Sequence, residues 1–370
     1  MKLVGRLWMG VLLSALLILG LAAPVAAWGG GALNDSQEPG SVLIFPYFRT
    51  GTVPSNQSPT HPKTEIEISV TCPRDTSCPT GDANTGEAVR LRAHWVCPGT
   101  NTDTKCREVN FNLSTTVNGT LFFNPNNAPE MSTPSNTGLR NATVPPPDCQ
   151  RGFLIVWVID QFNRPIKYDG LIGNAVVREE TRSAVAYNAL AIQAGPDLAP
   201  RAPTDENPGA GGYNAKLDFD GIEYKAITGK IFGTVRYEDA PPPLPSNQTR
   251  LILLTLDVVS NLPNAPTFVN LDFFKTDETV VSDSVDFVCW TRVRLTDINP
   301  SFTITNMGRK GLVESTQVVQ GSLVTGFRPV TLVGLVETDE RFATGAIDRD
   351  WMYYLSNDST AVTTTFTPSE

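Results

Sequence analysis

The feature that most constrains this chain is a two-residue alternation of apolar and polar side chains that recurs from segment to segment. In residues 64–70, for example, Ile66, Ile68 and Val70 occupy every second position, and polar residues lie between them. Residues 285–295 show the same pattern. A strand places successive side chains on opposite faces, so this pattern predicts strands with one buried and one solvated face. Sustained helical periodicity is nearly absent after residue 28, and we therefore expect an all-β chain.

Two proline-rich stretches, 194–212 and 239–247, interrupt the alternation. Proline cannot donate to a strand ladder, so these stretches read as connections. The 370 residues exceed what a single core usually holds. We expect two antiparallel β-sandwich domains of the immunoglobulin-like kind in tandem, over 28–200 and 201–370. The strand-like runs follow the same order in both halves. This order is explained either by a duplication or by the β periodicity that all such domains share.

Residues 1–27 have the pattern of a secretory signal. Lys2 and Arg6 precede an apolar stretch at 7–21, and small residues at 25–27 form a cleavage site. The apolar stretch is short for a bilayer span, so we expect cleavage rather than an uncleaved anchor helix. The protein is then secreted, to the periplasm or outside the cell, with no membrane span after cleavage.

All six cysteines follow this signal: Cys72, Cys78, Cys97, Cys106, Cys149 and Cys289. An even number of cysteines in an exported chain favours disulfide bonds. Cys72 and Cys78 bracket a short loop, and so do Cys97 and Cys106, so we expect a disulfide bond within each of these pairs. By subtraction, Cys149 is expected to pair with Cys289. Zinc needs ligands clustered at short spacing, and neither His61 nor His94 lies in such a cluster, so we expect no metal.

Charge and motifs exclude several function classes. The formal net charge is −9, which disfavours nucleic acid as a partner because phosphate binding needs a basic surface. The chain contains no phosphate-binding loop, no nucleophile elbow and no zinc-protease motif, and we expect no cofactor.

Histidine is the usual base of a serine hydrolase, and this chain has two. His94 shares a strand face with Arg90 and Arg92, so we expect it in a solvated polar row rather than as a catalytic base. Replacing it should then change stability by less than about 1 kcal/mol.

A glycoside hydrolase needs only two carboxylates across a cleft. The candidates are Asp218, Asp220, Glu223, Glu238, Asp339, Glu340, Asp348 and Asp350. With 38 acidic residues some clustering is inevitable, and spacing alone does not place two of them across a cleft. The first three also have the residue types of a calcium loop, but an Asp-Gly β-turn is the stronger interpretation because the EF-hand spacing is missing.

An exposed aromatic ring on a sheet face would favour sugar binding, because a flat ring covers the apolar face of a sugar. Three tryptophans are expected in the core: Trp95 shares a face with apolar residues, Trp157 lies in a wholly apolar run, and Trp351 belongs to an apolar alternation. The remaining candidate ligand-binding residues share one strand face: Trp290, Arg292 and Arg294. The ring there stacks either on a ligand or on a neighbouring guanidinium.

The segment 64–193 carries a series of short motifs: Cys106, Asn110-Phe111, Asn118-Gly119-Thr120, Arg151-Gly152-Phe153-Leu154-Ile155, Asp160, Pro165-Ile166, Leu171-Ile172-Gly173-Asn174-Ala175 and Tyr187-Asn188-Ala189. In this series it resembles a recurring domain of uncharacterised exported bacterial proteins, over about a third of the chain. The resemblance implies a secreted β-sandwich and no established activity, so no functional residue is carried over. Arg164 stands where that pattern often has a cysteine.

These observations favour a secreted or cell-surface protein with a structural or interaction role and no catalysis, whose partner is a protein or a cell-surface glycan. An extracellular carbohydrate-binding protein is the first alternative. A secreted glycoside hydrolase that works with two carboxylates is the second.

Overall fold

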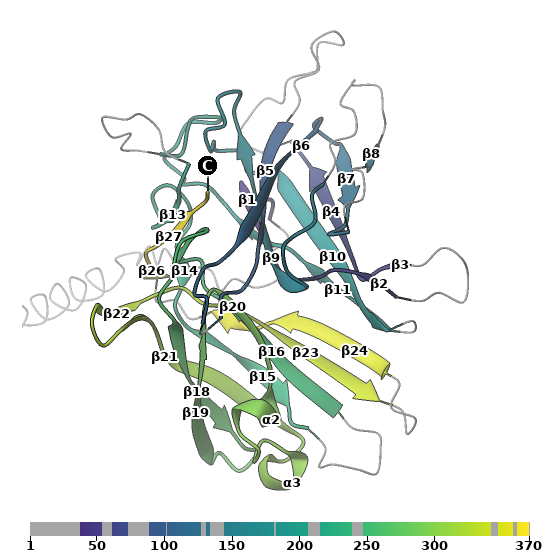
Figure 1. Cartoon of the computed structure of the whole chain (residues 1–370), viewed down its shortest axis with the longest axis vertical. Helices are drawn as coiled ribbons and strands as arrows, with labels where there is room; N and C mark the ends of the chain where they lie inside the picture. The colour runs from purple at the N-terminus through teal and green to yellow at the C-terminus, as the bar shows by residue number, and fades with distance from the viewer. Residues whose placement is uncertain are drawn as a thin grey trace, which may run out of the picture.

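The computed structural model describes residues 38–53, 61–72, 89–100, 102–126, 131–133, 144–180, 183–205, 215–238, 247–341, 347–357 and 361–369 (Figure 1). The regular elements in this part are strands, apart from two helices of one turn each, α2(Leu295–Ile298) and α3(Ile304–Met307). The prediction of an all-β chain is therefore confirmed. The expected signal at 1–27 lies outside the described residues.

The first half builds two five-stranded antiparallel sheets. The inner sheet has the order β12-β1-β9-β5-β6 and consists of β1(Val42–Arg49), β5(Val89–Val96), β6(Glu108–Thr115), β9(Arg151–Ile159) and β12(Leu190–Ile192). The outer sheet has the order β11-β10-β4-β7-β8 and consists of β4(Thr64–Val70), β7(Thr120–Phe123), β8(Met131–Thr133), β10(Leu171–Glu180) and β11(Ser183–Asn188).

The two sheets lie face to face (Figure 1). Trp95 of the inner sheet meets Phe123 of the outer sheet with ring centroids 6.0 Å apart. A Cβ at Gly173 would lie 2.6 Å from Cζ of Phe45, so this close approach of the sheets requires glycine. In β4 the side chains of Ile66 and Ile68 are buried, in agreement with the alternation.

The inner sheet is buried on both faces. Nearly every residue of β1 and β9 is buried, instead of every second one. Its second face is covered by a three-stranded sheet in the order β13-β27-β17, made of β13(Leu217–Phe219), β27(Thr364–Thr367) and β17(Val258–Val259). From β27, Phe366 contacts the ring of Trp157 with centroids 6.2 Å apart. The C-terminal strand thus completes the core of the first half.

The second half contains a six-stranded sheet and a four-stranded sheet. The six-stranded sheet runs β19-β18-β21-β15-β25 with β22 paired to β21, and comprises β15(Ile231–Arg236), β18(Thr267–Phe274), β19(Val280–Phe287), β21(Lys310–Ser322), β22(Gly326–Pro329) and β25(Ser356–Asn357). The four-stranded sheet runs β20-β16-β23-β24, with β16(Asn247–Leu254), β20(Trp290–Arg294), β23(Val333–Arg341) and β24(Ile347–Tyr354). Two pairs complete the fold: β2(Thr52–Val53) with β3(His61–Pro62), and β14(Ile227–Thr228) with β26(Ala361–Val362).

The four-stranded sheet also packs on two sides. Leu251 and Leu253 point into the core of the second half. Ile252 and Leu254, on the opposite face, belong to the core of the first half. Apolar side chains on both faces of one sheet therefore join the two halves of the chain.

The expected fold, two immunoglobulin-like sandwiches in tandem, is wrong. Two such domains contain four sheets, whereas the described strands form five small sheets of three or more strands, antiparallel except for the β17–β27 pair. The first strand of an immunoglobulin domain lies at a sheet edge, but β1 lies between β12 and β9. Alternation identifies strands but does not reveal which distant strand covers a second face. The boundary near residue 200 stays a prediction.

The disulfide bonds differ from the expected pairing. Cys97 is bonded to Cys149 and Cys106 to Cys289, with Cα–Cα distances of 5.7 and 6.3 Å. The predicted bridges Cys97–Cys106 and Cys149–Cys289 are therefore wrong. Short sequence spacing was a poor guide because strands distant in the sequence bring the cysteine pairs together. Cys72 is disulfide-bonded, and its predicted partner, Cys78, lies outside the described residues.

Disulfide bonds persist in oxidising compartments, so these bridges agree with a periplasmic or extracellular location. Within the described ranges, no helix has the length and apolar character needed to span a bilayer.

Candidate functional site

The structure places the predicted ligand-binding residues of β20 against the first half of the chain. Trp290 is 6% exposed, and its indole N–H donates to the carbonyl of Pro46 at 2.7 Å. Its ring stacks on Tyr47 with centroids 6.0 Å apart. The ring therefore packs on Tyr47, an aromatic residue of β1.

Arg292 and Arg294 have acidic partners within the chain. The Arg292 guanidinium donates two hydrogen bonds to Glu337, at 2.7 and 2.8 Å, and lies 5.4 Å from the ring centroid of Tyr47. Arg294 donates to the buried carboxylate of Glu238 at 2.6 Å. Ligand binding by this strand face stays a prediction, and its side chains already hold the two halves of the chain together.

The candidate hydrolase carboxylates are dispersed. Glu238 and Asp339 are buried, and each is paired with its own arginine, Arg294 and Arg250 respectively. The side chains of Asp348 and Asp350 lie outside the described residues. Neither the pocket lined by Asp257 and Arg328 nor the one lined by Arg236 and Trp351 is lined by a candidate carboxylate.

The predicted Asp-Gly turn is present. The carboxylate of Asp220 accepts hydrogen bonds from the backbone N–H groups of Ile222 and Glu223, and Gly221 has a φ of 93°. A separate carboxylate, Asp218, accepts from the hydroxyl of Thr365. Within the described residues, no three His, Cys, Asp or Glu side chains are grouped so that they could hold a metal ion.

The expectation that His94 is solvated is wrong, because the three-stranded sheet covers its face. Its side chain is fully buried and its ring stacks on Trp157 with centroids 4.5 Å apart. Nδ1 hydrogen-bonds the carboxylate of Glu108, and Nε2 accepts from Nε of Arg92 at 3.2 Å. These partners place the proton of a neutral imidazole on Nδ1. Burial lowers the pKa of His94.

The same carboxylate also bonds the end of the chain. The hydroxyl of Ser369 donates to Glu108 at 2.8 Å. Burial alone would raise the pKa of Glu108, but its hydrogen bonds, first of all that with His94, hold the pKa below its ordinary value. In a catalytic triad the histidine lies between the carboxylate and the serine, whereas here the carboxylate lies between the other two. This cluster therefore fixes the C-terminal segment and does not activate a nucleophile.

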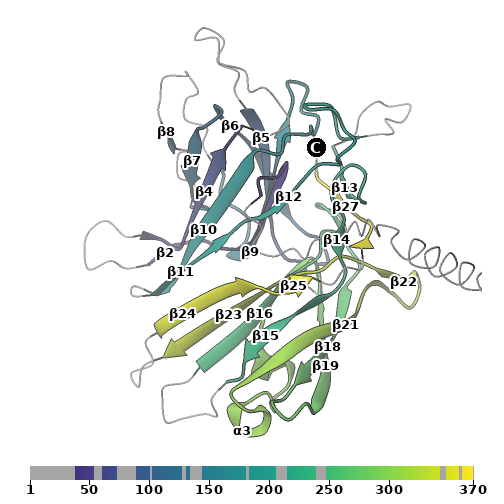
Figure 2. The ribbon, with the colours of Figure 1, turned by 180° about the vertical axis from the view of Figure 1, so that it is seen from behind.

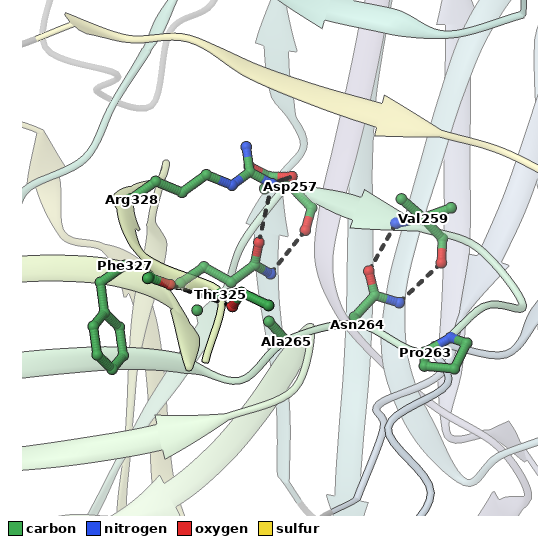
Figure 3. Close-up of a pocket in the computed structure, with 11 residues that line it drawn as sticks. Asp257, Val259, Pro263, Asn264, Ala265, Thr325, Phe327 and Arg328 are labelled. Atoms are coloured by element: carbon green, nitrogen blue, oxygen red, sulfur yellow. Dashed lines mark hydrogen bonds and ion pairs between the residues drawn. The ribbon is translucent and has the colours of Figure 1, made fainter. Parts of the chain in front are cut away.

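A pocket of about 320 Å³ opens beside the β21–β22 hairpin (Figure 3). Its floor is charged: the Arg328 guanidinium contacts both carboxylate oxygens of Asp257, each at 2.8 Å. Gln320 donates to the backbone carbonyl of Asp257 at 3.1 Å. Burial raises the pKa of Asp257, and the arginine opposes this effect. Oδ2 of Asp257 is buried and faces the Arg328 guanidinium, so the accessible charged group of the floor is this guanidinium, whose side chain is 64% exposed.

The far wall of the pocket is held rigidly. The side-chain amide of Asn264 accepts from the N–H of Val259 at 2.8 Å and donates to the carbonyls of Val259 and Leu262 at 2.9 and 2.8 Å (Figure 3). These three bonds use most of the hydrogen-bonding capacity of the amide. Asn264 thus shapes the wall and leaves recognition to other groups.

Large apolar side chains are exposed around the mouth of the pocket. Leu323 and Val324 at the hairpin tip are 96% and 95% exposed, and Phe327 is 49% exposed. The hydroxyls of Ser322 and Thr325 bond each other at 2.9 Å across the turn, which fixes the tip. We call this surface the hairpin site, made of Asp257, Gln320, Leu323, Val324, Phe327 and Arg328. It joins a rigid apolar tip to a polar pocket.

Sequence reasoning missed the hairpin site. A signal was present, since Leu323 and Val324 are adjacent apolar residues between the turn formers Ser322 and Thr325. The alternation pattern assigns residues to the two faces of a strand, so it does not identify two adjacent apolar residues in a turn as an exposed site. Trp351 was also misplaced: it was expected in the core but is 38% exposed.

Comparison with known proteins identifies no family. No family description matches the chain, and no curated protein matches it. Among solved structures, a β-glucuronidase of Bacteroides uniformis aligns at 11% identity with a TM-score of 0.13, over 88% of this chain and 28% of that one. A calcium-binding mutant of β-glucuronidase 2 from the same organism aligns at 10% identity with a TM-score of 0.11, over 83% and 28%. The chain thus spans less than a third of the length of these enzymes, and such low scores carry no argument about fold or activity.

Proposed function

We propose that the chain is an exported, non-enzymatic binding protein that docks a protein partner at the hairpin site. The observation that carries this proposal is the nearly complete exposure of Leu323 and Val324 on a fixed turn. Exposed apolar side chains that are grouped together and rimmed by polar residues mark contact sites for a partner, and Leu323, Val324 and Phe327 are grouped in this way beside a polar pocket. The turn bonds hold the tip in place before binding, which lowers the entropy lost on association.

The chemistry of the site defines the partner. Burying one leucine and one valine side chain contributes about 1.5–3 kcal/mol each, so the tip needs an apolar surface opposite it. Beside the tip, the side chain of Arg328 is 64% exposed, so the partner also needs a hydrogen-bond acceptor for its guanidinium. A protein surface with an apolar depression and one inserted amide or hydroxyl group meets both requirements.

Export supports the same proposal. The signal-like N-terminus and the disulfide bonds agree with a protein that acts outside the cytoplasm. The buried carboxylates Glu238, Glu337 and Asp339 are each paired with an arginine, which leaves them a structural role. These pairings support a binding role over hydrolysis.

The test is site-specific photo-crosslinking in cells that export the protein. A benzoylphenylalanine residue replaces Leu323 in one variant and the exposed Asn270 of β18 in a control variant. We expect one discrete cross-linked protein from position 323 and none from position 270. The same cross-link should disappear when Asp257 is changed to Ala in the 323 variant. Cross-linking to lipid alone, or identical products from both positions, would contradict the proposal.

A further inference from the structure

A second concave surface lies on the other side of the second half, where β15 of the six-stranded sheet runs beside β23 and β24 of the four-stranded sheet (Figure 2). We call it the aromatic groove. It has a volume of about 470 Å³. The residues that line it include Thr234, Arg236, Lys310, Thr338, Trp351 and Tyr353. It shares no residue with the hairpin site.

Two cations stand next to each other in this groove. Arg236 and Lys310 are direct partners in the β15–β21 register. Like charges directly opposite each other destabilise a sheet. Within the described part of the chain no carboxylate forms an ion pair with either, and Nε of Arg236 is buried without a hydrogen-bond partner.

This lack of acidic partners is unusual for the chain. Its net charge is −9, and Arg250, Arg292, Arg294 and Arg328 each have their own carboxylate. Carboxylates are thus abundant, yet among the described side chains neither of these two cations is paired with one. A site with this electrostatic character favours an anionic ligand.

The aromatic residues indicate what else the ligand contains. The Trp351 ring is 38% exposed, and the Arg236 guanidinium lies 5.8 Å from its centroid. Tyr353 donates from its hydroxyl to the backbone carbonyl of Thr234 at 2.9 Å, which fixes the second ring. Flat rings of this kind pack against the apolar C–H face of a sugar.

We propose that the aromatic groove binds an acidic glycan. Arg236 and Lys310 bind the carboxylate or sulfate groups of the polymer, and Trp351 packs against a sugar ring. An acidic peptide would satisfy the cations but has no rigid apolar face to match the tryptophan, so the combination favours a glycan. This site is independent of the hairpin site, and the cross-linking test described above does not depend on it.

Binding is measured by isothermal titration calorimetry on the full exported chain. The carboxylated probe is polygalacturonate, with methyl-esterified galacturonan as its neutral counterpart, and the sulfated probe is dextran sulfate, with dextran as its counterpart. We expect a charged polymer to bind at least about tenfold more tightly than its neutral counterpart, with the preference falling as salt screens the charges. The two pairs also show whether carboxylate or sulfate is preferred.

Variants locate the binding in the groove. The double change R236Q/K310Q and the single change W351A should each weaken binding of the charged polymer at least about tenfold. Lys275→Gln, which removes a cation from the same sheet outside the groove, should leave binding unchanged. Thermal unfolding of each variant confirms that it is folded.

Three results would overturn the proposal. One is the absence of binding to either charged polymer by the unmodified protein. Another is equally tight binding of polyglutamate, which would show a charged-peptide site instead. The last is full binding by folded W351A, which would leave charge alone as the cause.

Discussion

Replacing His94 with Ala tests whether the C-terminal strand forms part of the core of the first half. In the structure the imidazole stacks on Trp157 and connects the Glu108 carboxylate to the Arg92 guanidinium. A solvated strand face would tolerate this substitution almost without cost. The layered arrangement, in contrast, makes it one of the most damaging single changes in the chain.

The magnitude follows from the interactions that the imidazole makes. Removing the neutral imidazole takes a hydrogen bond from the buried Glu108 carboxylate, and a hydrogen bond to a charged group contributes about 1.5–3 kcal/mol. Loss of the stacked pair with Trp157 adds about 1 kcal/mol, part of which relaxation of the cavity recovers. We therefore expect His94→Ala to lower the free energy of unfolding by about 2–4 kcal/mol. His94→Asn, whose amide N–H can still reach Glu108, should lose less.

The assay is urea denaturation at pH 7.5, followed by tryptophan fluorescence, with an unchanged slope as evidence that the same transition is measured. Arg90→Ala is the matched control, because Arg90 points to the same strand face but makes only exposed hydrogen bonds. We expect this control to change stability by no more than about 0.5 kcal/mol. A loss of less than about 1 kcal/mol for His94→Ala would refute the reasoning.

Three further predictions follow from burial and connectivity. The pKa values of His94 and Glu108 are both lowered in the folded protein, so the unfolded chain binds more protons. The free energy of unfolding should therefore fall as the pH drops below about 6.5, which urea denaturation between pH 7.5 and 4.5 measures. The pKa of Asp257 is raised, so the folded protein holds this proton to higher pH than the unfolded chain. The stability of the wild type relative to Asp257→Asn should therefore decrease as the pH rises above about 4. Changing both Cys106 and Cys289 to Ser opens a loop with a sequence separation of 183 and should cost about 3–5 kcal/mol in denaturation without reductant, whereas an unchanged midpoint would contradict the bridge.

The sequence was informative where one face of a strand is buried and the other is solvated. In β4 the alternation of Ile66 and Ile68 with acidic residues indicated both the strand and its buried face. The apolar runs of β1 and β9 also marked strands, but they carry no information on which segment lies on the second face. That segment is β27, more than 150 residues away along the chain from either strand, and no local pattern points to it.

The sites were harder to predict for a related reason. Trp290 alternates in step with Arg292 and Arg294, which resembles a solvated face, but two buried carboxylates from other elements, Glu337 and Glu238, pair with these arginines. Such partners are supplied by tertiary structure. Conversely, the exposure of Trp351 depends on its place at the side of a groove between two sheets, which strand alternation does not encode.

The most direct test of the central claim is the affinity of the cross-linked partner, once purified, for the hairpin site. Calorimetry compares the wild type with the double variant L323S/V324S and with Asn270→Ser as a control. Loss of two buried apolar side chains predicts an affinity at least about 100-fold lower for the double variant, since about 3 kcal/mol is the lower end of what their burial contributes, and an unchanged affinity for the control. Equal affinity of the wild type and the folded double variant would contradict the claim that this hairpin docks a protein partner.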